Sequence, residues 1–167
     1  MQQASKLLVA KDIWKKYGPV EVLKGVSLEI EKGELVSIVG ASGAGKSTLL
    51  YIVSSLEQAD KGEVTFNGQK ITKLNNKELA AHRNHSMGFV FQFHHLLPEF
   101  TAIENVMLPM QRLGKLSSKE MRSRAIELLA SFGLEDQTHK LPKQMSGGQS
   151  QRVAMARALA NEPQLIL

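Results

Sequence analysis

The residues best suited to chemistry form a glycine-rich segment from Gly40 to Ser47, which reads Gly-Ala-Ser-Gly-Ala-Gly-Lys-Ser. It matches the pattern G-x-x-x-x-G-K-[S/T] without a gap. Glycines allow the backbone to wrap closely round a phosphate with its N–H groups pointing inward. Lys46 can then reach the β- and γ-phosphates, and Ser47 can bind Mg²⁺. The segment predicts a nucleoside triphosphate site, and a chance match in an ordinary turn is the weaker alternative.

A second candidate site lies at Ser146-Gly147-Gly148, where a helix is expected to begin. Serine is a favoured helix N-cap, and two glycines after it leave the first backbone N–H groups open to an anion. One chain does not need two phosphate sites for one nucleotide. If two chains pair head to tail, each helix start can close over the γ-phosphate bound by the other chain.

The elements that would position the phosphate site follow from the residue patterns. Val26–Ile30 alternates apolar and polar residues, which predicts a half-buried strand. The apolar run Leu35–Val39 predicts a buried strand directly before the glycine-rich loop, and Ser47–Val53 predicts a helix directly after it. Glu63–Phe66 predicts another strand, and Asn67-Gly68 is a favoured two-residue hairpin turn.

The second half of the chain is expected to be more helical. Met87–Phe91 predicts a buried strand, and Ser117 with Glu120 predicts the capped start of a helix. A second helix is expected from Gln149 to Ala160, and a strand begins near Leu165. The first of these helices has apolar residues at helical spacing and ends before Gly133; those residues are Met121, Ala125, Leu128, Leu129 and Phe132.

Composition narrows the class of protein. The 167 residues suit one domain, and 43% hydrophobic with 22% charged residues is ordinary for a globular protein. The chain has no cysteine, which excludes disulfides and thiolate metal sites and fits a reducing compartment. No apolar run approaches the ~20 residues that span a bilayer, and the first ten residues do not resemble a signal peptide. The net charge of +5 is spread along the chain, so it is read as a solvated surface.

With both glycine motifs in place, the chain resembles the ATP-binding-cassette (ABC) family, whose signature sequence matches Met145–Leu159, with Met145 where leucine is usual. The resemblance implies an α/β fold: a P-loop NTPase core with an antiparallel β subdomain and a helical signature subdomain, incomplete at the C-terminus. It implies one ABC domain over residues 1–167. Within it, residues 1–91 would form the core and β subdomain, 92–148 the Q-loop and helical subdomain, and 149–167 the signature helix and the start of the Walker B strand.

The resemblance also assigns residue roles. Tyr17 stands where the family places an aromatic that stacks on adenine, and Gln92 matches the Q-loop glutamine that contacts Mg²⁺ and the attacking water. Lys46 and Gln92 are the candidate catalytic residues, and Ser47 and Gln92 the candidate Mg²⁺ ligands. The alternatives are a surface role for Tyr17 and a strand-end polar role for Gln92. The full set expected to contact ATP is Tyr17, Gly40, Ala41, Ser42, Gly43, Ala44, Gly45, Lys46, Ser47, Thr48, Gln92, Ser146, Gly147, Gly148 and Gln149.

The segment after Gln92, which contains Phe-His-His-Leu-Leu-Pro, is similar to the ATP-binding subunits of bacterial lipoprotein-releasing systems. That narrower resemblance implies a pair of ATP-binding subunits that work with integral membrane permease subunits through residues 92–106, at the cytoplasmic face of the inner membrane. Macrolide export, cell division and import stay open as other cargo classes. His94 and His95 have no third ligand at metal spacing, so an exposed docking loop is expected there instead.

The resemblance leaves parts of the family pattern unmatched. The strand that begins at Leu165 stands where the family's Walker B strand begins, and its aspartate, the following glutamate and the switch histidine have no counterpart among the 167 residues. The chain is therefore expected to be a fragment or truncated product that binds ATP but hydrolyses it slowly or not at all, and a regulatory role is an alternative. A DNA-repair or chromosome ATPase is disfavoured because only 52 residues separate Gln92 from Met145, too few for the inserted coiled coil, and no nucleic-acid partner is expected.

Overall fold

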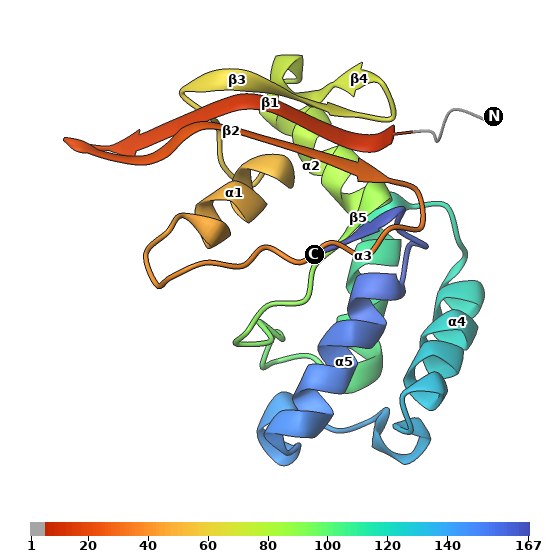
Figure 1. The fold of residues 1–167 in the computed structure, drawn as a ribbon. Coiled ribbons are helices and arrows are strands. Elements are labelled where there is room, and N and C mark those ends of the chain that lie inside the picture. Colours follow the sequence, from red (N-terminus) through yellow and green to blue (C-terminus); the bar gives the residue numbers. More distant parts are fainter. Residues whose placement is uncertain (1–5) are drawn as a thin grey trace. The chain divides into compact units, whose positions relative to one another are not determined.

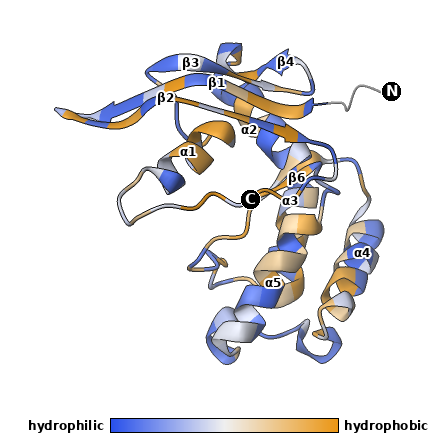
Figure 2. Ribbon diagram, in the orientation of Figure 1, coloured by the Kyte–Doolittle hydropathy of each residue, from blue (hydrophilic) through white to orange (hydrophobic). Residues whose placement is uncertain are grey.

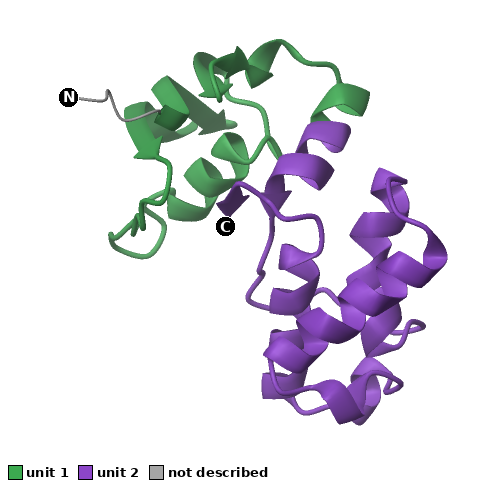
Figure 3. Cartoon of the chain, turned by 90° about the vertical axis from the view of Figure 1, so that its right-hand side faces the viewer, with its two compact units in different colours: residues 1–79 green, residues 80–167 purple. Residues whose placement is uncertain are grey.

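The computed structural model describes residues 6–167 and consists of two compact units, whose border lies between Leu79 and Ala80. The border falls inside helix α2 (Asn76–Ser86), which Figure 3 shows in both colours. Each unit has its own buried side chains and is described by itself below. The borders expected from the sequence, after residues 91 and 148, stay predictions.

The first unit is built on a four-stranded antiparallel sheet with the strand order β2-β1-β3-β4 (Figure 1). This confirms the antiparallel β subdomain. The expected strands at 26–30 and 63–66 are parts of longer strands, and Asn67-Gly68 forms the two-residue turn between β3 and β4. The strands are β1 (Lys6–Tyr17), β2 (Val20–Glu31), β3 (Lys61–Phe66) and β4 (Gln69–Lys70).

Helix α1 (Lys46–Val53) confirms the helix expected after the glycine-rich loop. Beyond its first turn the helix is mostly apolar, as Figure 2 shows. Leu49, Ile52 and Val53 are buried, as are residues of β1 and β3 such as Leu8 and Val64. Burial of apolar side chains from both the helix and the strands supplies the main driving force for folding of this unit. A short 3₁₀ helix, η1 (Ile71–Lys73), follows β4.

The expectation of a buried strand at Leu35–Val39 is wrong for this structure. The segment carries no strand assignment, and Leu35 and Val39 are 95% and 88% exposed. A buried strand needs hydrogen-bonding neighbours, and none of the strand pairs in residues 6–167 includes this segment. The apolar residues of this segment are typical of a buried strand, but the structure places no neighbouring strands beside them that would bury them.

The second unit is mainly helical. Its helices pack through apolar faces, which Figure 2 shows along α3 and α5. The two helices expected from the sequence are confirmed, and Ser117 and Glu120 form the expected capping box. A third helix, α3, was not expected; it begins with a capping box formed by Thr101 and Glu104. The elements are α3 (Ala102–Leu113), α4 (Ser118–Ser131), η2 (Glu135–Gln137), η3 (Pro142–Gln144) and α5 (Gly147–Leu159).

A short parallel pair of strands, β5 (Met87–Gly88) and β6 (Leu165–Ile166), completes the second unit. The strand expected at 87–91 is confirmed only in its first two residues, although Val90 N–H still donates to Leu167 O at 2.8 Å. A Cβ atom at Gly88 would collide with the carbonyl oxygen of Ala158. Glycine therefore lets helix α5 approach β5 closely.

Candidate functional site

The glycine-rich loop ends in a helix start that is open to an anion. Gly45 is the N-cap of α1 with a φ of 83°, and its missing Cβ would lie 2.9 Å from Leu23 Cδ2. Only glycine meets both conditions without strain. No side chain caps the helix, and no acidic residue lies in its first turn. The first backbone N–H groups of α1 can therefore serve a phosphate, which the helix dipole also favours.

Lys46 lies over this loop. Its Nζ donates to Gly40 O at 2.9 Å and to Ala41 O at 2.7 Å. A hollow of about 300 Å³ lies beside it, lined by Val22 and residues 43–48. The structure thus brings residues 40–48 together as one loop with a lysine over it, called the phosphate cradle below, an arrangement whose charge and backbone N–H groups can accept a polyphosphate.

Tyr17 is the last residue of β1, next to the turn that leads into β2. Its side chain is 48% exposed, and its hydroxyl donates to the Glu57 carboxylate at 2.7 and 2.6 Å. This hydrogen bond raises the pKa of Tyr17, while the hydroxyl of Thr48 in α1 partly opposes that rise. Tyr17 and the phosphate cradle therefore lie side by side in the first unit.

The signature sequence forms the start of α5 in the second unit. Ser146 is the N-cap, and its Oγ accepts from Gln149 N at 3.2 Å, while Gln149 Oε1 accepts from Ser146 N at 2.8 Å. Gly147 and Gly148 have nothing within 4 Å of the position of a Cβ. The two glycines therefore leave an unobstructed helix start, although Ser146 and Gln149 are engaged with each other.

Gln92 lies in a turn after β5, also in the second unit. The segment that follows exposes apolar side chains: Phe93 is 77% exposed, and Leu97 and Phe100 are also exposed. His95 packs edge-on against Phe91, with ring centroids 5.0 Å apart. Residues 93–100, called the post-Gln92 loop below, thus present an apolar surface, as the sequence predicts.

Two residues that the sequence did not single out hold the post-Gln92 loop. Arg157 of α5 donates to the carbonyl oxygens of His94 and His95, at 2.7 Å each. Burial lowers the pKa of the Arg157 guanidinium. Asn105 of α3 is fully buried and hydrogen-bonds to the backbone of Leu97 and to the carbonyl oxygens of Phe100 and Thr101. The sequence could have indicated Asn105 as a polar residue on an apolar helix face, but only if helix α3 had been predicted.

The predicted residues therefore fall into two groups. Tyr17 and residues 40–48 belong to the first unit, and Gln92 and Ser146–Gln149 belong to the second. The joint binding of Mg²⁺ by Ser47 and Gln92 stays a prediction. Among residues 6–167, no group of three acidic or histidine side chains is arranged to hold a metal ion by itself, and no helix there is long and apolar enough to cross a membrane.

The sequence and the fold match a known family. The sequence model of the ABC transporter family matches residues 23–167, so the chain belongs to that family. Its structure is similar to that of the solved dimeric bacterial ABC transporter cassette MJ0796, with a TM-score of 0.89 and 44% identity over 95% of this chain and 72% of that one. A post-hydrolysis structure of MJ0796 bound to ADP and Pi gives a TM-score of 0.88 with the same identity and coverage.

More specific relatives are ATP-binding proteins of lipoprotein-releasing systems. The chain is 53% identical to LolD of Bacteroides thetaiotaomicron over 96% of this chain and 73% of the relative. It is 51% identical to LolD of Aquifex aeolicus over 97% of this chain and 72% of the relative. An ABC transporter ATP-binding protein of Thermotoga maritima is 49% identical over 97% of this chain and 70% of the relative. The chain is thus an ABC ATP-binding subunit, and its sequence is similar to those of the LolD proteins.

Proposed function

We propose that this chain is the ATP-binding subunit of a transporter that releases lipoproteins from the bacterial inner membrane. The phosphate cradle carries the ATP-binding part of the proposal: an uncapped helix start, an adjoining glycine loop and Lys46 over the loop. The names of the LolD relatives support the lipoprotein part.

Each part of the nucleotide has a proposed binding group. The triphosphate binds residues 40–48, and the adenine ring stacks on Tyr17. Ser47 and Gln92 hold Mg²⁺, which when bound neutralises charge on the phosphates. The open, acid-free start of α1 fits such a ligand because it offers N–H groups and a positive dipole end.

Two copies of the subunit are proposed to pair head to tail. The Ser146–Gln149 helix start of one copy then closes over the γ-phosphate held by the other. The open surroundings of Gly147 and Gly148 support this role, as does the dimeric state of the MJ0796 cassette. Pairing would place a second set of N–H donors on the phosphate that a single cradle reaches from one side.

The region from Gln92 to Val106 is proposed to bind the membrane permease subunits, which would place the chain at the cytoplasmic face of the inner membrane. The exposed apolar side chains of Phe93, Leu97 and Phe100 support this docking role. A different cargo, as in macrolide export or cell division, is the second candidate. The name of the Thermotoga relative gives no cargo, so that relative does not distinguish the two candidates.

The ATP-binding proposal is tested with Lys46→Ala. Loss of one charge-assisted contact should weaken ATP binding by about 1.5–3 kcal/mol, measured by titration calorimetry in the presence of Mg²⁺. Equal affinity for ATP in the parent chain and in Lys46→Ala would contradict the proposal. Steady ATP turnover that Lys46→Ala abolishes would indicate hydrolysis at the same phosphate cradle.

A further inference from the structure

The most informative group outside the family motifs is a cluster of charged residues around Tyr17. Lys15 Nζ lies 3.0 Å from Glu57 Oε1 and 3.5 Å from Asp60 Oδ1, and it also donates to Gln58 O at 2.8 Å. The same ammonium lies 5.5 Å from the centroid of the Tyr17 ring. The end of β1 is thereby fixed to the loop at residues 57–60.

The backbone strengthens this connection. Lys16 N–H donates to Asp60 Oδ2 at 2.8 Å, and Asp60 N–H donates to Trp14 O at 2.9 Å. The main chain on both sides of Lys15, two residues before Tyr17, is therefore held by Asp60, which restricts the position from which the ring extends. An exposed tyrosine on an otherwise free strand end would keep its rotamer freedom and would lose it on binding a ligand.

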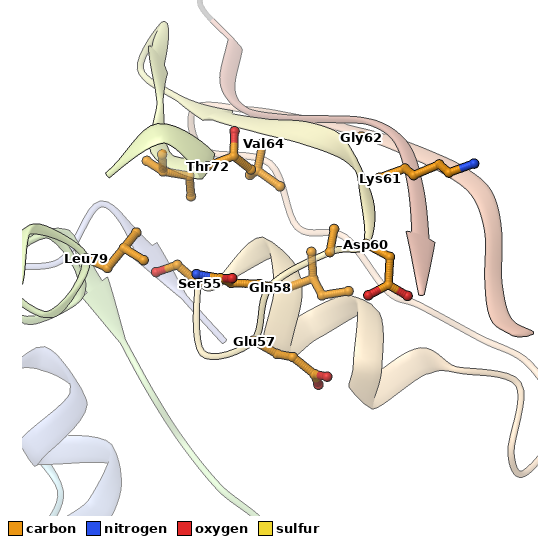
Figure 4. A pocket seen from close by; sticks show the side chains of 12 residues that line it. Ser55, Glu57, Gln58, Asp60, Lys61, Gly62, Val64, Thr72 and Leu79 are labelled. Carbon is orange, nitrogen blue, oxygen red and sulfur yellow. The ribbon is translucent and has the colours of Figure 1, made fainter. Parts of the chain in front are cut away.

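Glu57 is directed toward Tyr17 rather than toward the interior of the unit. The loop at residues 55–62 lines a hollow of about 210 Å³ (Figure 4). In that view the Glu57 side chain extends away from Val64 and Thr72 on the opposite wall. The Tyr17 hydrogen bond lowers the pKa of the Glu57 carboxyl, so the group accepts in its charged form.

The connection runs along a single helix. Residues 40–48, at the N-terminal end of α1, form the phosphate cradle, and the loop with Glu57 follows the C-terminal end of the same helix. Glu57 holds the Tyr17 hydroxyl, and helix α1 separates Glu57 from the phosphate cradle along the chain. This arrangement fixes how far the aromatic ring lies from a bound triphosphate.

We infer that Glu57 is a positioning residue that holds the Tyr17 ring for stacking on a nucleotide base, so that it selects a nucleoside triphosphate over a bare polyphosphate. The inference rests on the proposed role of Tyr17 in adenine binding. A ring that is ordered before binding loses less conformational entropy when the base stacks on it. Glu57 therefore contributes to affinity without touching the ligand.

The test compares binding of MgATP and of inorganic triphosphate to the full 167-residue chain by titration calorimetry. Glu57→Ala should bind ATP about three- to tenfold more weakly, the size of one partly exposed hydrogen bond, and should bind triphosphate as the parent does. Tyr17→Phe keeps the ring but lacks the hydroxyl, so it should show the same selective loss. The double variant should lose no more than Glu57→Ala alone, because Glu57→Ala already breaks the Tyr17–Glu57 hydrogen bond that Tyr17→Phe removes.

Two further variants separate positioning from a structural effect. Glu57→Gln should recover most of the ATP affinity, because its amide oxygen can accept from the Tyr17 hydroxyl. Glu63→Ala removes a carboxylate paired with Lys70 in the same unit and should leave both affinities unchanged. Unchanged ATP binding in Glu57→Ala, or an equal loss for ATP and triphosphate, would overturn the inference. A parent chain that binds neither ligand would overturn the proposed function as well.

Discussion

Lys46 and Tyr17 show how single side chains prepare the site for a ligand. Lys46 is held over the glycine-rich loop by two of the loop's own carbonyl oxygens. Tyr17 is held by Glu57, which follows helix α1 in the sequence, whereas the glycine-rich loop precedes that helix. A side chain that is ordered in advance loses less entropy on binding, so the Tyr17–Glu57 contact should favour the proposed nucleotide although it is not made to it. Lys46 keeps the third N–H of its ammonium for a phosphate.

The Tyr17–Glu57 hydrogen bond should withstand a wide range of pH. Its effect lowers the pKa of Glu57 and raises that of Tyr17. The stabilisation that ionised Glu57 gives to the hydrogen bond is fully present above the ordinary pKa of a glutamate and is lost only as the pH falls through the lowered pKa. The stabilisation that the neutral Tyr17 hydroxyl gives is fully present below the ordinary pKa of a tyrosine and is lost only as the pH rises through the raised pKa. The ratio of ATP affinities of parent and Glu57→Ala should therefore stay constant between about pH 5.5 and 9. The ratio cancels the ionisation of ATP itself, and a steady decline across that interval would contradict the account.

At the scale of elements, the helix starts that the sequence predicted are those of α1, α4 and α5, while that of α3 was missed. The spacing of Ser117 and Glu120 predicts the capping box of α4, and the glycine-rich motif predicts α1, because both depend on contacts within a few residues. The expected strand at Leu35–Val39 is absent because a strand needs neighbours distant in sequence. The roles of Arg157 and Asn105 were not predicted either, because both side chains bind the backbone of the post-Gln92 loop, and the packing of α3 and α5 sets those contacts.

Asn105→Ala tests whether α3 organises the post-Gln92 loop. The change removes four part-buried hydrogen bonds between the Asn105 side chain and the backbone of residues 97–101, so it should lower the free energy of unfolding by about 2–4 kcal/mol. Denaturant unfolding measures this. Gln111→Ala, at an exposed position of the same helix, is the matched control and should change stability little. A loss at Asn105 no larger than at Gln111 would show that the loop is held by other contacts.

At the scale of the whole molecule, the residues assigned to one nucleotide lie in both compact units. The phosphate cradle and Tyr17 belong to residues 6–79, and Gln92 with the signature helix belongs to residues 80–167. The family match covers residues 23–167 and so includes the phosphate cradle, Gln92 and the signature helix. In the proposed function, the signature helix that closes over the γ-phosphate comes from a second copy of the chain.

MgATP should promote pairing of two chains through the signature helix. Sedimentation of the chain should show a larger species with MgATP than without it. Gly148→Glu places a carboxylate and its bulk at the open start of α5, where it repels the γ-phosphate, so it should abolish the ATP-dependent change while leaving ATP binding by single chains intact. Ser118→Glu, at an exposed position in the first turn of another helix of the same unit, adds the same single negative charge and is the matched control. A Gly148→Glu chain that still pairs with ATP would exclude the signature helix from the interface.

The measurement that bears most directly on the account is photolabelling with 8-azido-ATP followed by peptide mapping. The reactive group sits on the adenine ring, so a base stacked on Tyr17 should label the tryptic peptide at residues 17–24, which the Lys16 and Lys24 cleavage sites define. Excess ATP should suppress this label, and Lys46→Ala should reduce it. Labelling that ATP does not suppress, or ATP-sensitive labelling confined to peptides far from both Tyr17 and the glycine-rich loop, would contradict the assigned nucleotide site.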